Sequence, residues 1–146
     1  MYNIKTRINK GKKEIFDPIR CMYVSATPEE YVRQAFILHL LNNLKVPKIA
    51  IAVEKQINYN GTAKRFDIAI QYKGKFLVIV ECKAPSVNLS EDTLLQASIY
   101  NKGLFAEYIV LINGKTCLTL KRNEANYQPI DNVPSYHELI LSVDKD

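Results

Sequence analysis

The sequence predicts an α/β fold of the α+β kind, in which a mixed central β-sheet of about five strands is flanked by helices. Two observations predict it: short apolar runs of strand length recur along the chain, and helix start signals precede and interrupt them. The 146 residues, 47% hydrophobic and 24% charged, suit one domain with its own core. The expected order is helix, three strands, helix, two strands (α-β-β-β-α-β-β).

The first helix has the clearest start signal. Thr27 is a favourable N-cap, a proline follows at the first helical position, and Glu30 stands where it would close a capping box. An apolar stripe follows, and the helix should end before Pro47. Residues 49–59 then favour a strand that ends at an Asn-Gly turn.

The next two strands form a predicted hairpin. Residues 65–72 and 75–83 are strand-like runs on either side of a turn centred on Gly74. This register pairs Asp67 with Glu81, with Cβ atoms about 5 Å apart. The opposite face then carries only core residues: Phe66, Ile68, Ile70, Val78, Val80 and Cys82.

The second half of the chain has weaker signals. It contains a predicted helix at 89–103, a hairpin of strands at 106–112 and 115–121, and a polar, irregular segment at 122–134. Ser135 and Glu138 predict a short, capped last helix.

Positive charge is concentrated near the N-terminus. Residues 1–25 hold six lysines and arginines against two acids, within a net charge of +5 for the chain. We expect one domain overall, with a basic arm at 1–24 that packs on or extends from the core, a core at 25–121 and a C-terminal extension at 122–146. Such an arm suits a phosphate backbone, and its DNA-contact candidates are Lys10, Lys12 and Lys13. A solvated, partly frayed terminus is the alternative.

Several classes of protein are disfavoured. No apolar run approaches the roughly 20 residues of a membrane span, and no apolar segment follows the basic N-terminus as in a signal peptide. The three cysteines are odd in number and lack C-x-x-C spacing. We therefore expect a cytoplasmic protein with neither a disulfide framework nor a zinc site.

The hairpin predicts a reactive cluster. Lys83 follows Glu81 by two residues, so it shares a face with Glu81 and, across the ladder, with Asp67. Two facing carboxylates repel each other unless a cation lies between them, and Mg²⁺ prefers oxygen ligands. An ammonium group beside them can hold or activate a water and offset charge on a phosphate. These are the requirements of phosphodiester hydrolysis, although a solvated Glu-x-Lys ion pair is the structural alternative.

Asp67 followed by Glu81-Cys82-Lys83, in this order of elements, resembles the PD-(D/E)xK nuclease core, although Phe66 stands where the motif has proline. More specifically, the chain resembles the N-terminal nuclease domain of type I restriction enzyme R subunits, with a restriction-endonuclease-like core. The segments that carry the resemblance are DPIR (17–20), TPEEYVRQ (27–34), VEKQI (53–57), RFDIAI (65–70), VECKAPS (80–86) and QASIY (96–100).

The resemblance implies a metal-dependent DNA endonuclease that uses Mg²⁺, for which Mn²⁺ substitutes. We expect no nucleotide cofactor, because the sequence lacks G-x-x-x-x-G-K-[ST]. Asp67 and Glu81 would bind the metal together with the backbone carbonyl of Cys82. Lys83 would assist the water, and Gln96 would position the substrate or a metal-bound water.

Three further residues are accessory candidates. Glu30 matches the place where relatives carry an additional acid on the first helix, but its capping role also explains it. Glu54 would lie opposite Asp67 if the Asn60-Gly61 turn between them makes a tight hairpin; otherwise Glu54 is a charged residue at a strand edge. Tyr100 shares a helix face with Gln96, and a polar stripe on an exposed helix explains that pair equally.

The resemblance also sets limits on function. R subunits use a helicase-type motor, but the chain has no G-x-x-x-x-G-K-[ST]: residues 114–116 imitate its end, while Ile109 occupies the first glycine position. We therefore expect a nuclease module that does not translocate DNA by itself. DNA is the expected partner, and a motor or specificity subunit and a homodimer are further hypotheses. The alternatives are a structure-selective repair or resolvase-like nuclease, and a non-catalytic DNA-binding or partner-binding module with a vestigial site.

Overall fold

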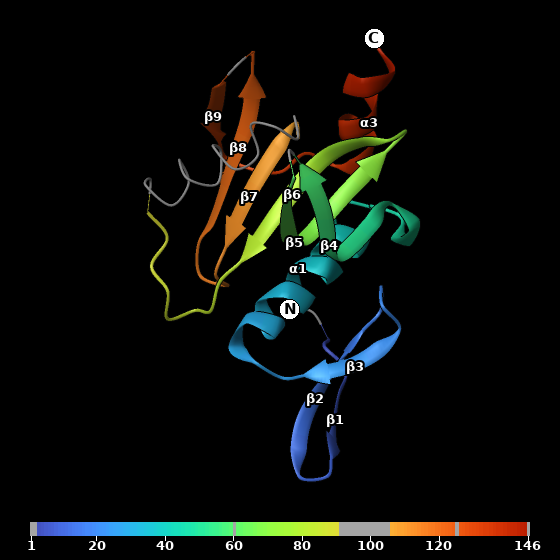
Figure 1. Ribbon diagram of the computed structural model, residues 1–146, viewed down its shortest axis with the longest axis vertical. Helices are drawn as coiled ribbons and strands as arrows, with labels where there is room; N and C mark the ends of the chain where they lie inside the picture. Colours follow the sequence, from blue (N-terminus) through green and yellow to red (C-terminus); the bar gives the residue numbers. More distant parts are fainter. Residues whose placement is uncertain (1–2, 60, 91–105, 125, 146) are drawn as a thin grey trace.

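The computed structural model describes residues 3–59, 61–90, 106–124 and 126–145. It has a three-stranded sheet in the order β1-β2-β3 and a six-stranded sheet in the order β4-β5-β6-β7-β8-β9 (Figure 1). Its elements are β1 (Thr6–Asn9), β2 (Lys12–Asp17), β3 (Met22–Ser25), α1 (Pro28–Asn42), η1 (Lys48–Ala50), β4 (Ile51–Tyr59), β5 (Thr62–Tyr72), β6 (Lys75–Cys82), β7 (Tyr108–Ile112), β8 (Cys117–Asn123), β9 (Asn126–Ile130) and α3 (Tyr136–Asp144). The predicted α+β class with a mixed sheet is confirmed.

The large sheet has one more strand than expected. Its neighbours are antiparallel except for the parallel pair β6 and β7. The sixth strand, β9, lies in the segment predicted to be irregular, so the sheet extends beyond the predicted core boundary at residue 121. Pro129 argues against a strand in the sequence, because proline cannot donate a hydrogen bond to a neighbouring strand. It is tolerated here because β9 is an edge strand.

Helix α1 covers one face of the large sheet. Their shared core contains Val32, Phe36, Ile37 and Leu40 of α1, Ile68, Ile70, Val78, Val80 and Cys82 of the sheet, and Leu139 of α3. Phe66 was predicted for this face but packs with Ile79 and Ala106 in a separate cluster. The α1 core matters for function because it fixes the N-terminal half of the helix against the ends of β5 and β6.

The helix boundaries follow the local signals. The Thr27 hydroxyl accepts a hydrogen bond from the Glu30 N–H at 3.1 Å, and α1 ends well before Pro47. The Ser135 hydroxyl accepts from the Glu138 N–H in the same way, as predicted for the last helix. Strand β4 begins two residues later than predicted, after the short 3-10 helix η1. The predicted helix at 89–103 lies mostly outside the described part of the chain, which omits residues 91–105.

The β5–β6 hairpin departs from the predicted register at its turn. The turn has two residues, Lys73 and Gly74, with φ values of 49° and 75°. Tyr72 therefore pairs with Lys75, whereas a turn centred on Gly74 would pair it with Phe76. Two consecutive residues with positive φ are what a type I′ turn requires, and glycine makes the second inexpensive.

A β-bulge restores the predicted register further along. Strand β6 carries one extra residue, Leu77, which the ladder skips, and Ile70 then pairs with Val78 as predicted. Leu77 and Val78 are both fully buried in the α1 core, as a bulge allows for adjacent residues. The bulge is therefore what sets which residues meet at the far end of the hairpin.

The N-terminal segment is a β-ribbon rather than a frayed arm. Strands β1, β2 and β3 form an antiparallel sheet that extends away from the large sheet (Figure 1). The Arg7 guanidinium lies 3.9 Å from the centroid of the Tyr23 ring and pairs with Glu14 at 2.7 Å. The sequence analysis predicted no strand here because β1 is exposed at every position and so lacks the apolar alternation that marks a strand.

Within the described part of the chain, no helix combines the length and apolar character that crossing a bilayer demands.

Candidate active site

Asp67 and Glu81 lie side by side at the end of the β5–β6 ladder. The last printed pair is Ile68 with Val80, and the next step along both strands sets Asp67 opposite Glu81. Asp67 Oδ2 accepts a hydrogen bond from the Cys82 N–H at 2.7 Å, which fixes the carboxylate to β6. Without the bulge in β6, Asp67 would oppose Val80, and the two carboxylates would not face each other.

The two carboxylates perturb each other strongly. Burial raises the pKa of Glu81, the negative charge of Asp67 raises it further, and the nearby Lys83 ammonium opposes both, leaving the pKa at about 8. Glu81 is thus largely protonated at neutral pH when nothing else compensates the charge. The structure brings the other two residues of the predicted cluster, Asp67 and Lys83, close enough to act on Glu81.

The segment after Glu81 is held at both ends. The Lys83 N–H donates to the Ile112 carbonyl at 2.8 Å, which extends the contact between β6 and β7. Asn113, buried in the predicted β7–β8 turn, donates to the Val87 carbonyl at 2.8 Å through its side-chain amide. These bonds fix the backbone around Lys83, so its ammonium group is presented from a rigid base.

Glu30 was expected to close the capping box, and the structure corrects this. The Thr27 N–H donates to the Ser25 carbonyl, and the Glu30 carboxylate is turned away toward other partners. It accepts from Arg33 Nε at 2.9 Å, from Arg33 Nη2 at 2.8 Å and from Gln34 Nε2 at 3.1 Å. Because residues i, i+3 and i+4 share a helix face, the sequence pattern E-x-x-R-Q builds this buried cluster.

Arg33 connects Glu30 to the acids of the sheet. Its guanidinium lies 3.4 Å from Glu54 Oε1, and its Nη1 atom lies 3.7 Å from Asp67 Oδ1. Val53 pairs with Ile68, so Glu54 falls opposite Asp67, as proposed for a tight hairpin. Glu54 has a φ of 54° and its side chain is 40% exposed, so it lies at the solvent edge of the cluster.

Arg20 reaches the same cluster from the N-terminal ribbon. Its guanidinium lies 3.2 Å from Glu54 Oε2 and 3.4 Å from Glu30 Oε1. The fully buried Asp17 holds it: Asp17 Oδ2 accepts from Arg20 Nε at 2.7 Å, and Oδ1 accepts from the N–H groups of Ile19 and Arg20. Burial alone would raise the pKa of Asp17, but the hydrogen bonds from Arg20 outweigh it and the pKa is lowered.

Substituting Asp17 with asparagine is expected to lower the free energy of unfolding by about 2–4 kcal/mol, because Arg20 would lose a buried counter-charge. Urea unfolding at pH 7 measures this. Glu14→Gln is the control: it breaks a neighbouring ion pair with a more exposed Arg7 and should cost less than about 1 kcal/mol. Equal losses in the two variants would contradict the role given to Asp17.

The sequence analysis missed Arg20, Arg33, Gln34 and Asp17. Two signals in the sequence could have found them. In TPEEYVRQ, Glu30, Arg33 and Gln34 have the i, i+3, i+4 spacing of one helix face. In DPIR, Asp17 stands two and three residues before the backbone amides that donate to its side chain. What joins them is a contact across 34 residues, between Arg20 and Glu54, which no local pattern contains. Gln96 and Tyr100, both predicted for the site, lie outside the described residues.

The donor set suits a hard divalent cation. Asp67 and Glu81 offer carboxylate oxygens. The whole cluster has a formal excess of two negative charges, because it contains five acids and three basic residues: Asp17, Glu30, Glu54, Asp67 and Glu81, and Arg20, Arg33 and Lys83. In the described part of the chain, no three His, Cys, Asp or Glu side chains are arranged as a metal-binding group. Mg²⁺ commonly uses one or two carboxylates and takes its other ligands from water and substrate phosphate, so these residues fit it.

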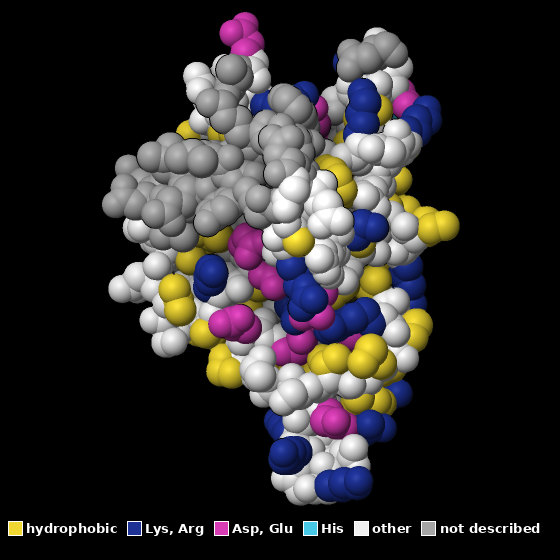
Figure 2. All heavy atoms as spheres, in the orientation of Figure 1, with side chains coloured by type: hydrophobic (Ala, Val, Ile, Leu, Met, Phe, Trp, Pro, Cys, Tyr) yellow, Lys and Arg dark blue, Asp and Glu magenta, His cyan; other side chains and the backbone are white. Residues whose placement is uncertain are grey.

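The ribbon carries the predicted DNA-contact residues. Lys10 lies in the β1–β2 turn, and Lys12 and Lys13 begin β2; all three are exposed. Figure 2 shows basic side chains on this ribbon, with acidic and basic side chains gathered above it on the same face.

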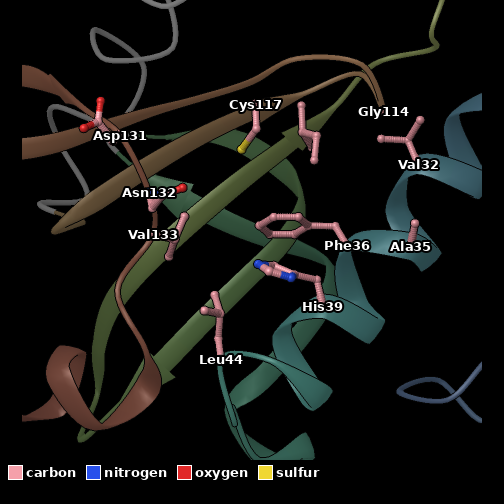
Figure 3. A pocket seen from close by; sticks show the side chains of 11 residues that line it. Val32, Ala35, Phe36, His39, Leu44, Gly114, Cys117, Asp131, Asn132 and Val133 are labelled. Carbon is pink, nitrogen blue, oxygen red and sulfur yellow. The ribbon is translucent and has the colours of Figure 1, made fainter. Parts of the chain in front are cut away.

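A pocket of about 510 Å³ lies on a different face of α1 (Figure 3). It is lined by Val32, Ala35, Phe36, His39, Leu44, Ile112, Gly114, Cys117, Asp131, Asn132 and Val133. Burial lowers the pKa of His39, whose ring lies 5.8 Å from that of Phe36. None of the residues predicted for the active site lines this pocket.

The comparisons with known proteins identify a family for the chain. The family model described as type I restriction enzyme R protein N terminus (HSDR_N) matches residues 28–134. The match includes Glu30, Arg33, Asp67, Glu81 and Lys83, while the ribbon precedes it. No curated protein and no solved structure matches the chain. Because the family model covers most of the sequence, the chain belongs to the type I restriction enzyme R protein N-terminal family.

Proposed function

We propose that this chain is a Mg²⁺-dependent DNA endonuclease module of the PD-(D/E)xK type. The observation that carries the proposal is the pair of carboxylates, Asp67 and Glu81, apposed beside Lys83, with the pKa of Glu81 raised to about 8. Such a pair is costly unless a cation relieves it, which is the arrangement expected of a functional site. Membership of the R protein family supports a nuclease role over a structural ion pair.

Each residue has a defined task in this proposal. Asp67, fixed by the Cys82 N–H, and Glu81 would bind the cation, and the Cys82 carbonyl is a further ligand candidate. A bound Mg²⁺ supplies Lewis-acid polarisation of the phosphate and lowers the pKa of a water. Lys83 orients the attacking water and offsets the charge that develops on the phosphate oxygens. Gln96 remains a proposed substrate-positioning residue.

We also propose how the DNA and other subunits meet the module. The exposed lysines of the ribbon would contact the phosphate backbone and hold the duplex against the same face as the site. A separate motor or specificity subunit would deliver the DNA. Free thiols at Cys21, Cys82 and Cys117 suit the cytoplasm.

Cleavage assays test the function. Purified protein is incubated with supercoiled plasmid, linear duplex and single-stranded oligonucleotides, in Mg²⁺ or Mn²⁺ and in chelator. Cleavage should require the cation, and Lys83→Ala should lower the rate about 10²–10³-fold by removing a charge used in the transition state.

Lys75→Ala is the matched control, because Lys75 is exposed at the other end of the same strand. It should cut at the wild-type rate. Cleavage in chelator, equal rates for Lys83→Ala and wild type, or no cleavage of any substrate at saturating cation would each contradict the proposal.

A further inference from the structure

Arg33 is the buried cation that faces Asp67 of the proposed metal site, the strand acid Glu54 and the helix acid Glu30. The residue is only 9% exposed. The Glu30 carboxylate accepts two short hydrogen bonds from the guanidinium, one from Nε and one from Nη2. This bidentate geometry holds a guanidinium most firmly. The side chain is therefore anchored from behind and cannot swing away from the sheet without breaking a buried ion pair.

The third guanidinium nitrogen of Arg33, Nη1, does not hydrogen-bond to Glu30. Nη1 is buried and makes no hydrogen bond, although it lies 3.7 Å from Asp67 Oδ1 and 3.4 Å from Glu54 Oε1. At 3.7 Å the positive charge of Nη1 stabilises Asp67 without a hydrogen bond to Oδ1, whereas Glu54 Oε1 accepts a hydrogen bond from Nη2 at 3.4 Å. The Cys82 N–H donates to Oδ2 of Asp67, while Oδ1 faces Arg33.

We infer that Arg33 is the resident counter-charge of Asp67, a positioning residue that stabilises the metal-free site and opposes cation binding. The inference rests on the proposed function, in which Asp67 binds Mg²⁺. A divalent ion at Asp67 takes over the compensation that Arg33 provides and is repelled by it, because Glu30 keeps the guanidinium in place. Arg33 thus sets the cation affinity of the site.

Arg20 provides the contrast. It contacts the same Glu30 and Glu54, at 3.4 Å and 3.2 Å, but its third partner is Asp17 of the ribbon rather than Asp67. Neutralising either arginine removes one positive charge from the cluster and weakens a buried network. Only the loss of Arg33 removes the charge that faces Asp67.

The test measures cation binding, with Mn²⁺ as the probe and its free electron paramagnetic resonance signal as the readout. Arg33→Gln is expected to bind Mn²⁺ about tenfold more tightly than wild type, because one repulsive charge is removed from a partly buried site. Arg33→Lys keeps the charge, and Arg20→Gln keeps Arg33, so both should remain within about threefold of wild type. Thermal unfolding without cation should show lower melting temperatures for Arg33→Gln and Arg20→Gln alike.

The outcomes separate this inference from the proposed function. If wild type binds no Mn²⁺, or Asp67→Asn binds it as well as wild type, the metal site itself is wrong. If wild type binds and Arg33→Gln binds no more tightly, or Arg20→Gln gains equally, the counter-charge role alone is overturned. Should Arg33→Gln fail to fold, the double variant Glu30→Gln/Arg33→Gln removes both buried charges; it should bind Mn²⁺ at least as tightly as wild type, and weaker binding would overturn the inference.

Discussion

Replacing Asp67 with asparagine is expected to lower the rate of Mg²⁺-dependent DNA cleavage by at least about 10³-fold. Asparagine has the same shape and still accepts a hydrogen bond from the Cys82 N–H, so the hairpin should stay intact. What is lost is the negative charge that, in the proposed function, binds the cation together with Glu81. Initial rates of plasmid nicking at saturating Mg²⁺ measure the effect.

Asp144→Asn is the control for this variant. Asp144 lies near the other end of β5, where it pairs with Lys73 at 2.8 Å on the surface. It should leave both cleavage and Mn²⁺ binding unchanged. An Asp67→Asn protein that folds, as judged by its circular dichroism spectrum and unfolding midpoint, yet cleaves within tenfold of wild type would remove Asp67 from the catalytic group.

The second large effect is a pH dependence of stability that comes from Glu81. The pKa of Glu81 is about 8 in the folded protein and near 4.5 in the unfolded chain. Between pH 4.5 and pH 8, Glu81 therefore keeps a proton in the folded protein that it has released in the unfolded chain. Unfolding in this range releases that proton, so the free energy of unfolding falls as pH rises from 4.5 to 8. Each pKa unit corresponds to about 1.4 kcal/mol, and partial exposure of Glu81 reduces this, so the expected loss is about 2–4 kcal/mol.

Glu81→Gln isolates this contribution. Glutamine does not titrate, so the difference in unfolding free energy between wild type and variant should change steadily across this pH range, with the variant gaining relative stability toward pH 8. Saturating Mn²⁺ should reverse the wild-type trend, because a bound cation favours the ionised carboxylate. A difference that stays flat between pH 4.5 and 8 would show that Glu81 is not protonated in the folded protein.

The β5–β6 hairpin shows how a local pattern can give the right residue pairing from the wrong turn. The sequence analysis centred the turn on Gly74, but the structure has a two-residue turn and an extra residue, Leu77, in β6. These two differences cancel, so Asp67 still meets Glu81. The turn type was present in the sequence as Lys73-Gly74, whereas the bulge depends on packing Leu77 and Val78 together beneath α1.

The other wrong predictions also concern features that depend on contacts outside the local sequence. Strand β9 and the N-terminal ribbon escaped prediction because edge and exposed strands gain their stability from neighbouring strands and surface contacts rather than from apolar alternation. Glu30 was assigned to a capping box because that role is local. Its actual partners include Arg20, ten residues away in the chain and brought near by the turn that Asp17 holds.

The sequence by itself determined the α+β class, the starts of α1 and α3, and the closeness of Asp67, Glu81 and Lys83, because caps, strand alternation and hairpin pairing act over a few residues. Only the tertiary structure decided how that trio is compensated. Burial and the charge of Asp67 raise the pKa of Glu81, and Arg33 and Arg20 reach the acids of the sheet from a helix and a ribbon. Charge acts through space rather than along the chain, so the electrostatic state of the site was fixed by packing.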